Sequence, residues 1–301
     1  MQALRINREA IEQFCTQINE TAPIQLVAFN EKGPSESIVL AGNDTKRANE
    51  LCNKYGANGN IYYTVNIVDE SFKNKKPTKA DIIGLRAVWV DIDPQSDETV
   101  VEFRNRITPF IDQLKSTGAK ITYAVWSGGG VQIVIFQKKP TPISNEASER
   151  YERMCNQLIN ALGGDPGTQN IDRLLRLPGS VNNPTASKKA RGRQPCLSSF
   201  AIEPLDNWLA EDEHEIAQAV AELCEIAKAF GLVATIKPKV ENTQNNRDEA
   251  FKTLVQKLRS ENVSKIGSKN DLPHCLIEKL DKALLNNKKG GLKFEVQHPA
   301  G

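Results

Sequence analysis

The sequence predicts an α+β (mixed α/β) fold, in which a mixed sheet is flanked by helices and a helical region follows at the C-terminal end. Two observations support this prediction. Strand-like and helix-like patterns alternate, with hairpins among the strands, through residues 5–204. Hydrophobic residues make up 39% of the 301 residues, which supports a packed core, and charged residues make up an ordinary 25%.

Each element follows from a local pattern. Strands are expected where short apolar runs rich in β-branched and aromatic residues stand between turn residues, namely at 27–30, 37–41, 61–68, 85–93, 121–126 and 131–137. Helices are expected where apolar residues recur at helical spacing, namely at 5–21, 43–55, 98–118, 145–164 and 205–231. Asn43 or Asp44 could cap the second of these helices, and glycines end the second, third and fourth.

The chain is expected to contain one large domain followed by smaller parts. A short apolar stretch at 195–204 closes the first unit, and polar residues after the last clear helix indicate a linker. The predicted parts are the first domain (1–204), a helical extension (205–235), a linker (236–248), a small basic helical region (249–288) and a flexible tail (289–301).

Composition excludes several classes of protein. The net charge is only +2, so any nucleic acid must bind through local basic patches. No apolar run approaches the roughly 20 residues of a membrane span, and the N-terminus lacks a signal peptide, so we expect a cytoplasmic protein (in the host cytoplasm if the chain is viral) that contacts no membrane. None of the six cysteines has CxxC spacing, which predicts reduced thiols.

The positions of the histidines narrow the chemistry further. The three histidines are His214, His274 and His298, and none lies within residues 1–213. Ser-His-Asp hydrolysis, Cys-His proteolysis and His-ligated zinc are therefore not open to that region.

The first motif that carries chemistry is VWVDIDPQ. Strand alternation places Asp91 and Asp93 on one face, about 7 Å apart along the chain. Two carboxylates at a strand end can share divalent ions, and oxygen ligands suit Mg²⁺ or Mn²⁺. The alternative is a pair of solvated acids that end a strand.

The second motif is the glycine-rich turn SGGGVQ. Its glycines let a ligand approach the backbone, and the flanking serine and glutamine can hydrogen-bond a nucleotide. The alternative is a tight hairpin between two strands. The candidate nucleotide-binding residues here are Ser127, Gly128, Gly129, Gly130 and Gln132.

The third motif lies in GGDPGTQNIDRLLRLPGSVNNP. Arg173 and Arg176 have side chains that match phosphate oxygens, and Asp165 or Asp172 could supply a third acid. If this stretch is a strand, residues three apart face opposite sides and one arginine is structural; if it bends or is helical, both could face one site. Surface ion pairs are the alternative for either arginine.

Together, the three motifs resemble those of the archaeo-eukaryotic primase (AEP) superfamily, especially the primase-polymerases of phages and plasmids, over roughly residues 25–200. Two acids one residue apart match its first motif, and the serine-glycine turn matches its second, with Gln132 where the family has a histidine. Asp165 with Arg173 and Arg176 matches its third. RLPGSVN at 176–182 and NIYYTVN at 60–66 also look like the phage and plasmid branch.

The resemblance implies a catalytic domain with an RRM-like sheet. Asp91, Asp93 and Asp165 would hold two divalent ions, Mg²⁺ or Mn²⁺, while the two arginines neutralise a triphosphate. The implied partners are a single-stranded DNA template, NTP or dNTP, and a replicative helicase supplied as a missing module or another chain. Basic residues that could contact DNA stand in KNKKPTK and SKKARGR: Lys73, Lys75, Lys76, Lys188, Lys189, Arg191 and Arg193.

Three functional hypotheses remain at this point. The main one is a DNA primase, polymerase or both, acting in phage or plasmid replication. The second is a catalytically weak or inactive primase-like module that binds single-stranded DNA in replication initiation, with Gln132 marking the loss of catalysis. The third is a nucleotidyltransferase or phosphohydrolase outside the primase group, which the RLPG stretch disfavours.

Overall fold

The computed structural model describes residues 4–19, 22–41, 44–56, 58–73, 76–95, 98–190, 192–203 and 209–232. Internal contacts divide the chain into Met1–Ile236 and Lys237–Gly301, so every described residue belongs to the first unit. The predicted linker, basic helical region and tail lie outside the described residues, as do Lys75 and Arg191.

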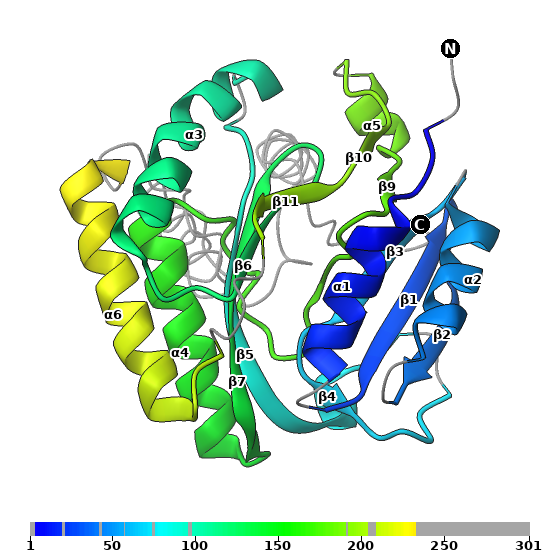
Figure 1. Cartoon of the computed structure of the whole chain (residues 1–301), viewed down its shortest axis with the longest axis horizontal. Coiled ribbons are helices and arrows are strands. Elements are labelled where there is room, and N and C mark those ends of the chain that lie inside the picture. The colour runs from blue at the N-terminus through cyan, green and yellow to red at the C-terminus, as the bar shows by residue number, and fades with distance from the viewer. Residues whose placement is uncertain are drawn as a thin grey trace, which may run out of the picture. The chain divides into compact units, whose positions relative to one another are not determined.

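The described part contains helices and strands in close alternation (Figure 1). The helices are α1 (Arg8–Asn19), α2 (Thr45–Tyr55), α3 (Val100–Thr117), α4 (Asn145–Leu162), α5 (Ala186–Lys189) and α6 (Glu213–Phe230), with a 3-10 turn η1 (Lys79–Asp81). The strands are β1 (Ile24–Asn30), β2 (Gly33–Leu40), β3 (Asn60–Thr64), β4 (Ile67–Val68), β5 (Ile82–Ile92), β6 (Tyr123–Trp126), β7 (Val131–Pro142), β8 (Leu174–Arg176), β9 (Val181–Asn182), β10 (Cys196–Leu197) and β11 (Ser199–Ile202).

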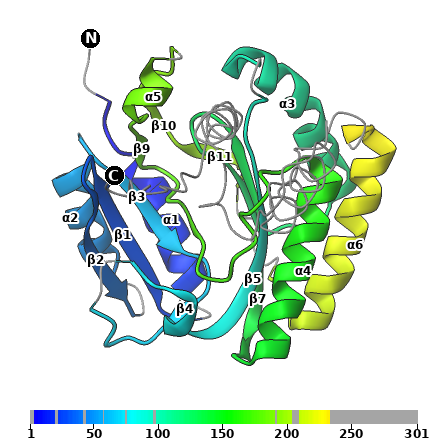
Figure 2. The ribbon, with the colours of Figure 1, turned by 180° about the vertical axis from the view of Figure 1, so that it is seen from behind.

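The strands form two main sheets, which confirms the α+β class. One has the order β2-β1-β3-β8 and the other the order β11-β6-β7-β5-β4, while β9 and β10 pair separately. The strand pairs inside both sheets are antiparallel. Figures 1 and 2 show α3, α4 and α6 together on one side of the five-stranded sheet, with α1, α2 and the four-stranded sheet on its other side.

The single strand predicted for 61–68 is wrong, because the chain leaves one sheet and enters the other within it. The strands β3 and β4 lie in different sheets. At the crossing, the Asn66 amide donates to the Ile171 carbonyl at 2.9 Å and accepts the Arg86 N–H at 3.0 Å. The fully buried Arg86 guanidinium also donates to the Val65 carbonyl at 2.8 Å, so side chains replace the missing strand partners.

Aromatic packing joins the two sheets through α1. The Phe14 ring lies 4.7 Å from the Tyr63 ring of β3 and 5.4 Å from the Tyr123 ring of β6. The hydroxyls of Tyr63 and Tyr123 are hydrogen-bonded to each other. Because both tyrosines are buried in the common core, the two sheets are held in one fixed arrangement around the site described below.

The helices at 98–118 and 145–164 begin and end close to where the sequence indicates. The helix expected at 205–231 begins only at Glu213 (α6), because Ala210 forms a β-bridge with Gln137 and Asp212 caps the helix. A capping box of Thr99 and Glu102 starts α3, and Gly118 ends it in the left-handed conformation. Ser144 caps α4, and Gly163 (φ 69°) ends it, which turns the chain back toward the end of β5. No helix in the described ranges is long and apolar enough to cross a membrane.

Candidate active site

The two acids of the first motif stand where β5 ends. Asp91 is the next-to-last residue of this strand, and Asp93 follows it. The Asp91 side chain is only 16% exposed. Burial raises the pKa of Asp91 to about 6, the nearby charge of Asp93 adds to the rise, and Arg173 and a hydrogen bond from Gln132 oppose it. The two carboxylates therefore repel each other in a poorly solvated place.

The loop after α4 brings Asp165 to the same end of β5. The backbone N–H of Asp165 donates to the Asp91 carbonyl at 2.8 Å. The Thr168 hydroxyl donates to the Asp165 carbonyl at 2.7 Å, and the Thr168 carbonyl accepts the Trp89 indole N–H at 2.9 Å. The backbone of the preferred third acid is therefore fixed beside the first acid.

The carboxylates themselves are not gathered into a metal site. Over the described ranges, no three His, Cys, Asp or Glu side chains form a group that could hold a metal ion. The three-acid site, with Asp165 or Asp172 as its third member, stays a prediction. The donor set suits a hard divalent cation, because Asp91 and Asp93 offer oxygen ligands whose mutual repulsion a cation would relieve.

Arg173 approaches the acids directly. Its Nη2 lies 3.4 Å from Oδ2 of Asp91, and its side chain is 31% exposed. Its backbone is fixed on both sides, since its N–H donates to the Asn170 carbonyl and its carbonyl accepts the Val65 N–H. Its Nε is buried and has no hydrogen-bond partner among the described residues. Arg173 thus combines a fixed backbone with a guanidinium that is partly exposed beside Asp91.

Arg176 has a different environment, although it is only three residues away. Its side chain is buried, and the pKa is lowered from its ordinary value mainly by that burial. Its guanidinium donates to Asn60 Oδ1 at 2.8 Å, to the Tyr62 hydroxyl at 2.8 Å and to Asn182 Oδ1 at 3.0 Å, and it lies 4.2 Å from the Tyr62 ring centroid. The Arg176 guanidinium is therefore hydrogen-bonded to neutral groups of the protein. This is the outcome expected if the stretch is a strand and one of its two arginines is structural.

Those partners come from two segments for which the sequence indicated a family resemblance but no function. Asn60 and Tyr62 belong to NIYYTVN, and Asn182 belongs to RLPGSVN. Sequence reasoning did not assign these three residues a role. The signal available was that both segments carry side-chain amides next to apolar strand residues, but nothing in the sequence places those amides around Arg176.

Gln132 links the first and third motifs. It is the cross-strand partner of Asp91 in the pairing of β5 with β7 and is 5% exposed. Its Oε1 accepts the backbone N–H of Arg176 at 3.0 Å, and its side chain also hydrogen-bonds the Asp91 carboxylate. The amide of Gln132 therefore contacts both the Asp91 carboxylate and the backbone of β8 at Arg176.

The glycine turn connects β6 to β7 as a tight hairpin. The Ser127 N–H donates to the Gly130 carbonyl at 2.9 Å, and Gly128 has a φ of 108°. A Cβ atom on Gly130 would lie 2.7 Å from Oδ1 of Asp93, and one on Gly129 would collide with the guanidinium of Arg193. The hairpin alternative therefore holds, and the bare backbone admits an acid on one side and an arginine on the other. The approach of a ligand to these glycines stays a prediction.

The basic residues proposed for DNA contact fall in two places. Lys73 and Lys76 are exposed in the loop before β5, which begins at Ile82, roughly 30 Å of strand away from Asp91. Lys188 and Lys189 lie on α5, and Arg193 lies against the glycine turn. Among the described members of this set, only Arg193 has a recorded contact with one of the motifs.

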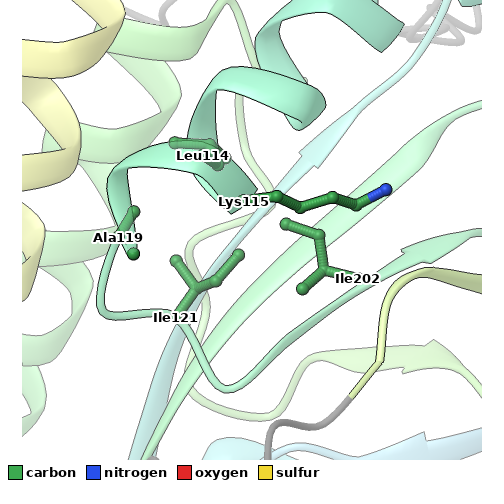
Figure 3. A pocket seen from close by; sticks show the side chains of 6 residues that line it. Leu114, Lys115, Ala119, Ile121 and Ile202 are labelled. Atoms are coloured by element: carbon green, nitrogen blue, oxygen red, sulfur yellow. The ribbon is translucent and has the colours of Figure 1, made fainter.

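A small cavity lies away from these motifs. It has a volume of about 80 Å³ and is surrounded by the end of α3, the loop after it and Ile202 of β11 (Figure 3). Its lining is mainly apolar, apart from Lys115. A cavity of this size is too small for a nucleotide, since small-molecule pockets usually measure roughly 300 Å³ or more.

Comparison with known proteins gives matches only among solved structures. No family model matches the chain, and no curated protein does so either. The AEP domain of the primase-polymerase of cyanophage S-2L is similar at 12% identity and a TM-score of 0.45, covering 72% of this chain and 100% of that one. The primase RepB' is similar at 12% identity and a TM-score of 0.40, covering 93% and 76%. Both are structures of primases.

Proposed function

We propose that this chain is a templated nucleotidyltransferase of the primase-polymerase kind, which joins nucleoside triphosphates on a single-stranded DNA template. The observation that supports it is the convergence of all three motifs on Asp91. Arg173 forms an ion pair with its carboxylate, Gln132 hydrogen-bonds it from the next strand, and Asp165 is joined to its backbone. The proposal therefore rests on contacts between segments far apart in sequence.

The residues divide the work as follows. Asp91 and Asp93, with Asp165 beside them, would hold the Mg²⁺ or Mn²⁺ ions. When bound, these ions lower the pKa of the attacking hydroxyl and neutralise the leaving pyrophosphate. Gln132 keeps the Asp91 carboxylate in one orientation. Arg173 offers its guanidinium to the triphosphate, because its side chain remains partly exposed beside Asp91.

The test is primer synthesis and primer extension on single-stranded DNA, with labelled NTPs and dNTPs in separate reactions containing Mg²⁺ or Mn²⁺. We expect incorporation by the wild type and a loss of about 1,000-fold or more in Asp91→Ala, because both cation binding and the contact with Arg173 are removed. Asp112→Ala is the matched control, since Asp112 is 63% exposed on α3. Retained synthesis in Asp91→Ala contradicts the proposal.

The second candidate is a primase-like module that binds single-stranded DNA without synthesis. The observation that favours it is Gln132, whose amide is occupied at both ends by protein groups and which cannot carry a proton as a histidine can. A gel-shift measurement beside the incorporation assay separates the two functions. Binding without incorporation under either metal supports the module.

A further inference from the structure

Two arginines and a tryptophan gather next to the glycine turn, and we call them the arginine–tryptophan cluster (Arg104, Trp126 and Arg193). The Arg104 guanidinium of α3 lies 5.2 Å from the ring centroid of Trp126, the last residue of β6. The Arg193 guanidinium rests against the bare backbone of Gly129 in the turn that follows. Three distant segments therefore place two cations and one aromatic ring together.

The two arginines of this cluster differ from a neighbouring arginine in how their charges are paired. Within the described ranges, neither Arg104 nor Arg193 forms an ion pair with an acid. By contrast, Arg106, two residues further along α3, donates to both carboxylate oxygens of Glu98 at 2.7 and 2.8 Å. The chain thus pairs one arginine of this helix and leaves its neighbour available.

A third arginine adds to the same positive field. The charges of Arg104, Arg176 and Arg193 all act on the Cys196 thiol, where they oppose the rise in pKa that burial causes. Guanidinium groups without acidic partners bind phosphate oxygens through two parallel hydrogen bonds. The local charge is therefore suited to an anion, although the chain as a whole carries only +2.

The aromatic ring identifies the kind of anion. Trp126 is partly exposed, and Arg104 is exposed beside it. Alternating cations and aromatic rings are the pattern by which proteins bind single strands, since the ring stacks on a base and the cations hold the backbone. A nucleoside triphosphate has the same two chemical parts, but the cluster is separated from the acids by Gly130, which touches Asp93.

We propose that the arginine–tryptophan cluster is a binding site for single-stranded DNA, in which Arg104 and Arg193 hold phosphates and Trp126 stacks on a base. Figures 1 and 2 show α5 and the start of α3 at the end of the described part where β5 finishes, so the bound strand runs past the acids. That this strand is the template rests on the proposed function; that it binds does not.

The first experiment measures fluorescence anisotropy of a labelled oligo(dT) with the full chain, without metal or nucleotide. We expect Arg104→Gln and Arg193→Gln each to weaken binding about tenfold. Each should lower the slope of log affinity against log salt by about 0.7, the value for one phosphate contact on a single strand. Arg106→Gln removes the same charge from α3 and should weaken binding less than twofold, because its partner is Glu98.

The second experiment separates stacking from charge. Trp126→Leu should weaken binding to oligo(dT) about tenfold and leave binding to an abasic oligonucleotide of equal length unchanged, because a base is needed for stacking. Trp126→Phe keeps a ring and should retain most of the affinity. Thermal melting checks that both variants are folded; if Trp126→Leu is not, the arginine variants on the two oligonucleotides decide the proposal.

Two results would overturn the inference. If Arg104→Gln and Arg106→Gln weakened DNA binding equally, the loss of affinity would be explained by net charge alone and not by a specific site. Unchanged DNA affinity with weakened binding of dTTP, measured by equilibrium dialysis, would make the cluster a triphosphate site. The proposed function can fail independently of this inference. If DNA binding depends on the cluster but the wild type incorporates no nucleotide, the DNA-binding site is supported and the enzymatic function is contradicted.

Discussion

The end of β5 and the arginine–tryptophan cluster lie on opposite sides of one glycine turn, and they differ in how their charges are balanced. At the end of β5, Asp91 has an arginine and a glutamine as partners inside the protein. In the cluster, Arg104 and Arg193 have no acid as an ion-pair partner among the described residues. Internal partners fix the orientation of a carboxylate, whereas unpaired cations favour a ligand from outside.

Because their charges are balanced differently, mutations in the two regions should be detected by different assays. Changes at the end of β5 should alter the rate of nucleotide incorporation and leave affinity for single-stranded DNA unchanged. Changes in the cluster should alter DNA affinity and leave the rate at saturating template unchanged. The variants below test whether the incorporation rate and the DNA affinity can be changed independently.

After Asp91→Ala, the largest effect is expected from Arg173→Met. The variant loses the partly exposed cation beside Asp91 that is proposed to bind the triphosphate, so incorporation should fall about 100-fold, the usual cost of losing one charged group aimed at the reacting phosphate. DNA affinity should change less than twofold. Arg153→Met is the control, because Arg153 is exposed on α4 and pairs with Glu149 one turn away. An equal fall in DNA affinity would break the separation.

The next effect concerns stability and pH. The pKa of Asp91 is raised to about 6, above the roughly 3.9 of an unfolded chain, so the folded state binds this proton more tightly. That stabilisation is present below about pH 4 and is lost as pH rises through about 6. Asp91→Asn should therefore raise the free energy of unfolding by about 2 kcal/mol at pH 8 and hardly change it at pH 4.

Urea unfolding in the presence of a chelator measures this difference. Asp112→Asn is the exposed control and should change the free energy of unfolding by less than about 0.5 kcal/mol. A wild type that is as stable as Asp91→Asn at pH 8 would show that the carboxylate is already fully balanced by its neighbours.

A smaller effect is expected from Gln132→Leu. It removes the link between the Asp91 carboxylate and the backbone of Arg176, so kcat for incorporation should fall about tenfold while the KM for nucleotide stays constant. Steady-state kinetics measure both values. A raised KM with constant kcat would instead support the interpretation from sequence, in which Gln132 contacts the nucleotide.

The smallest effects are expected from two neighbouring glycines. A Cβ at position 130 meets the backbone at Ile92 and the Asp93 side chain, so Gly130→Ala should slow incorporation about fivefold. A Cβ at position 129 meets only the end of the flexible Arg193 side chain, so Gly129→Ala should weaken DNA binding about twofold at constant rate. Identical profiles for the two variants would contradict the division at this turn.

The sequence predicted most of the elements because their signals are local. Helix caps, glycine ends and apolar runs located α2, α3, α4 and the strands around the glycine turn within a few residues. The failure at 61–68 has a specific cause. Strand propensity continues through this stretch, but contacts between Asn66 and Arg86 stabilise the point where the chain passes from one sheet to the other. These residues are 20 positions apart, so no local pattern predicts their contact.

The candidate site shows the same limit. Spacing alone placed Asp91 and Asp93 at a strand end, since strand alternation and the length of the apolar run are properties of one segment. Spacing could not distinguish Arg173 from Arg176. Their different surroundings depend on which strand lies beside β8, and that neighbour is β3 with Tyr62.

By itself, the sequence therefore determined the α+β class, the acids at the end of β5, the glycine turn and the absence of histidine from residues 1–213. Only the tertiary structure decided that Gln132 lies between the Asp91 carboxylate and the backbone of Arg176, that Arg176 is enclosed by neutral groups and that Arg104 lies over Trp126. The physical reason is the range of the interactions. Backbone periodicity and caps act within a few residues, whereas a side chain's partner depends on packing between segments that the chain brings together only when it folds.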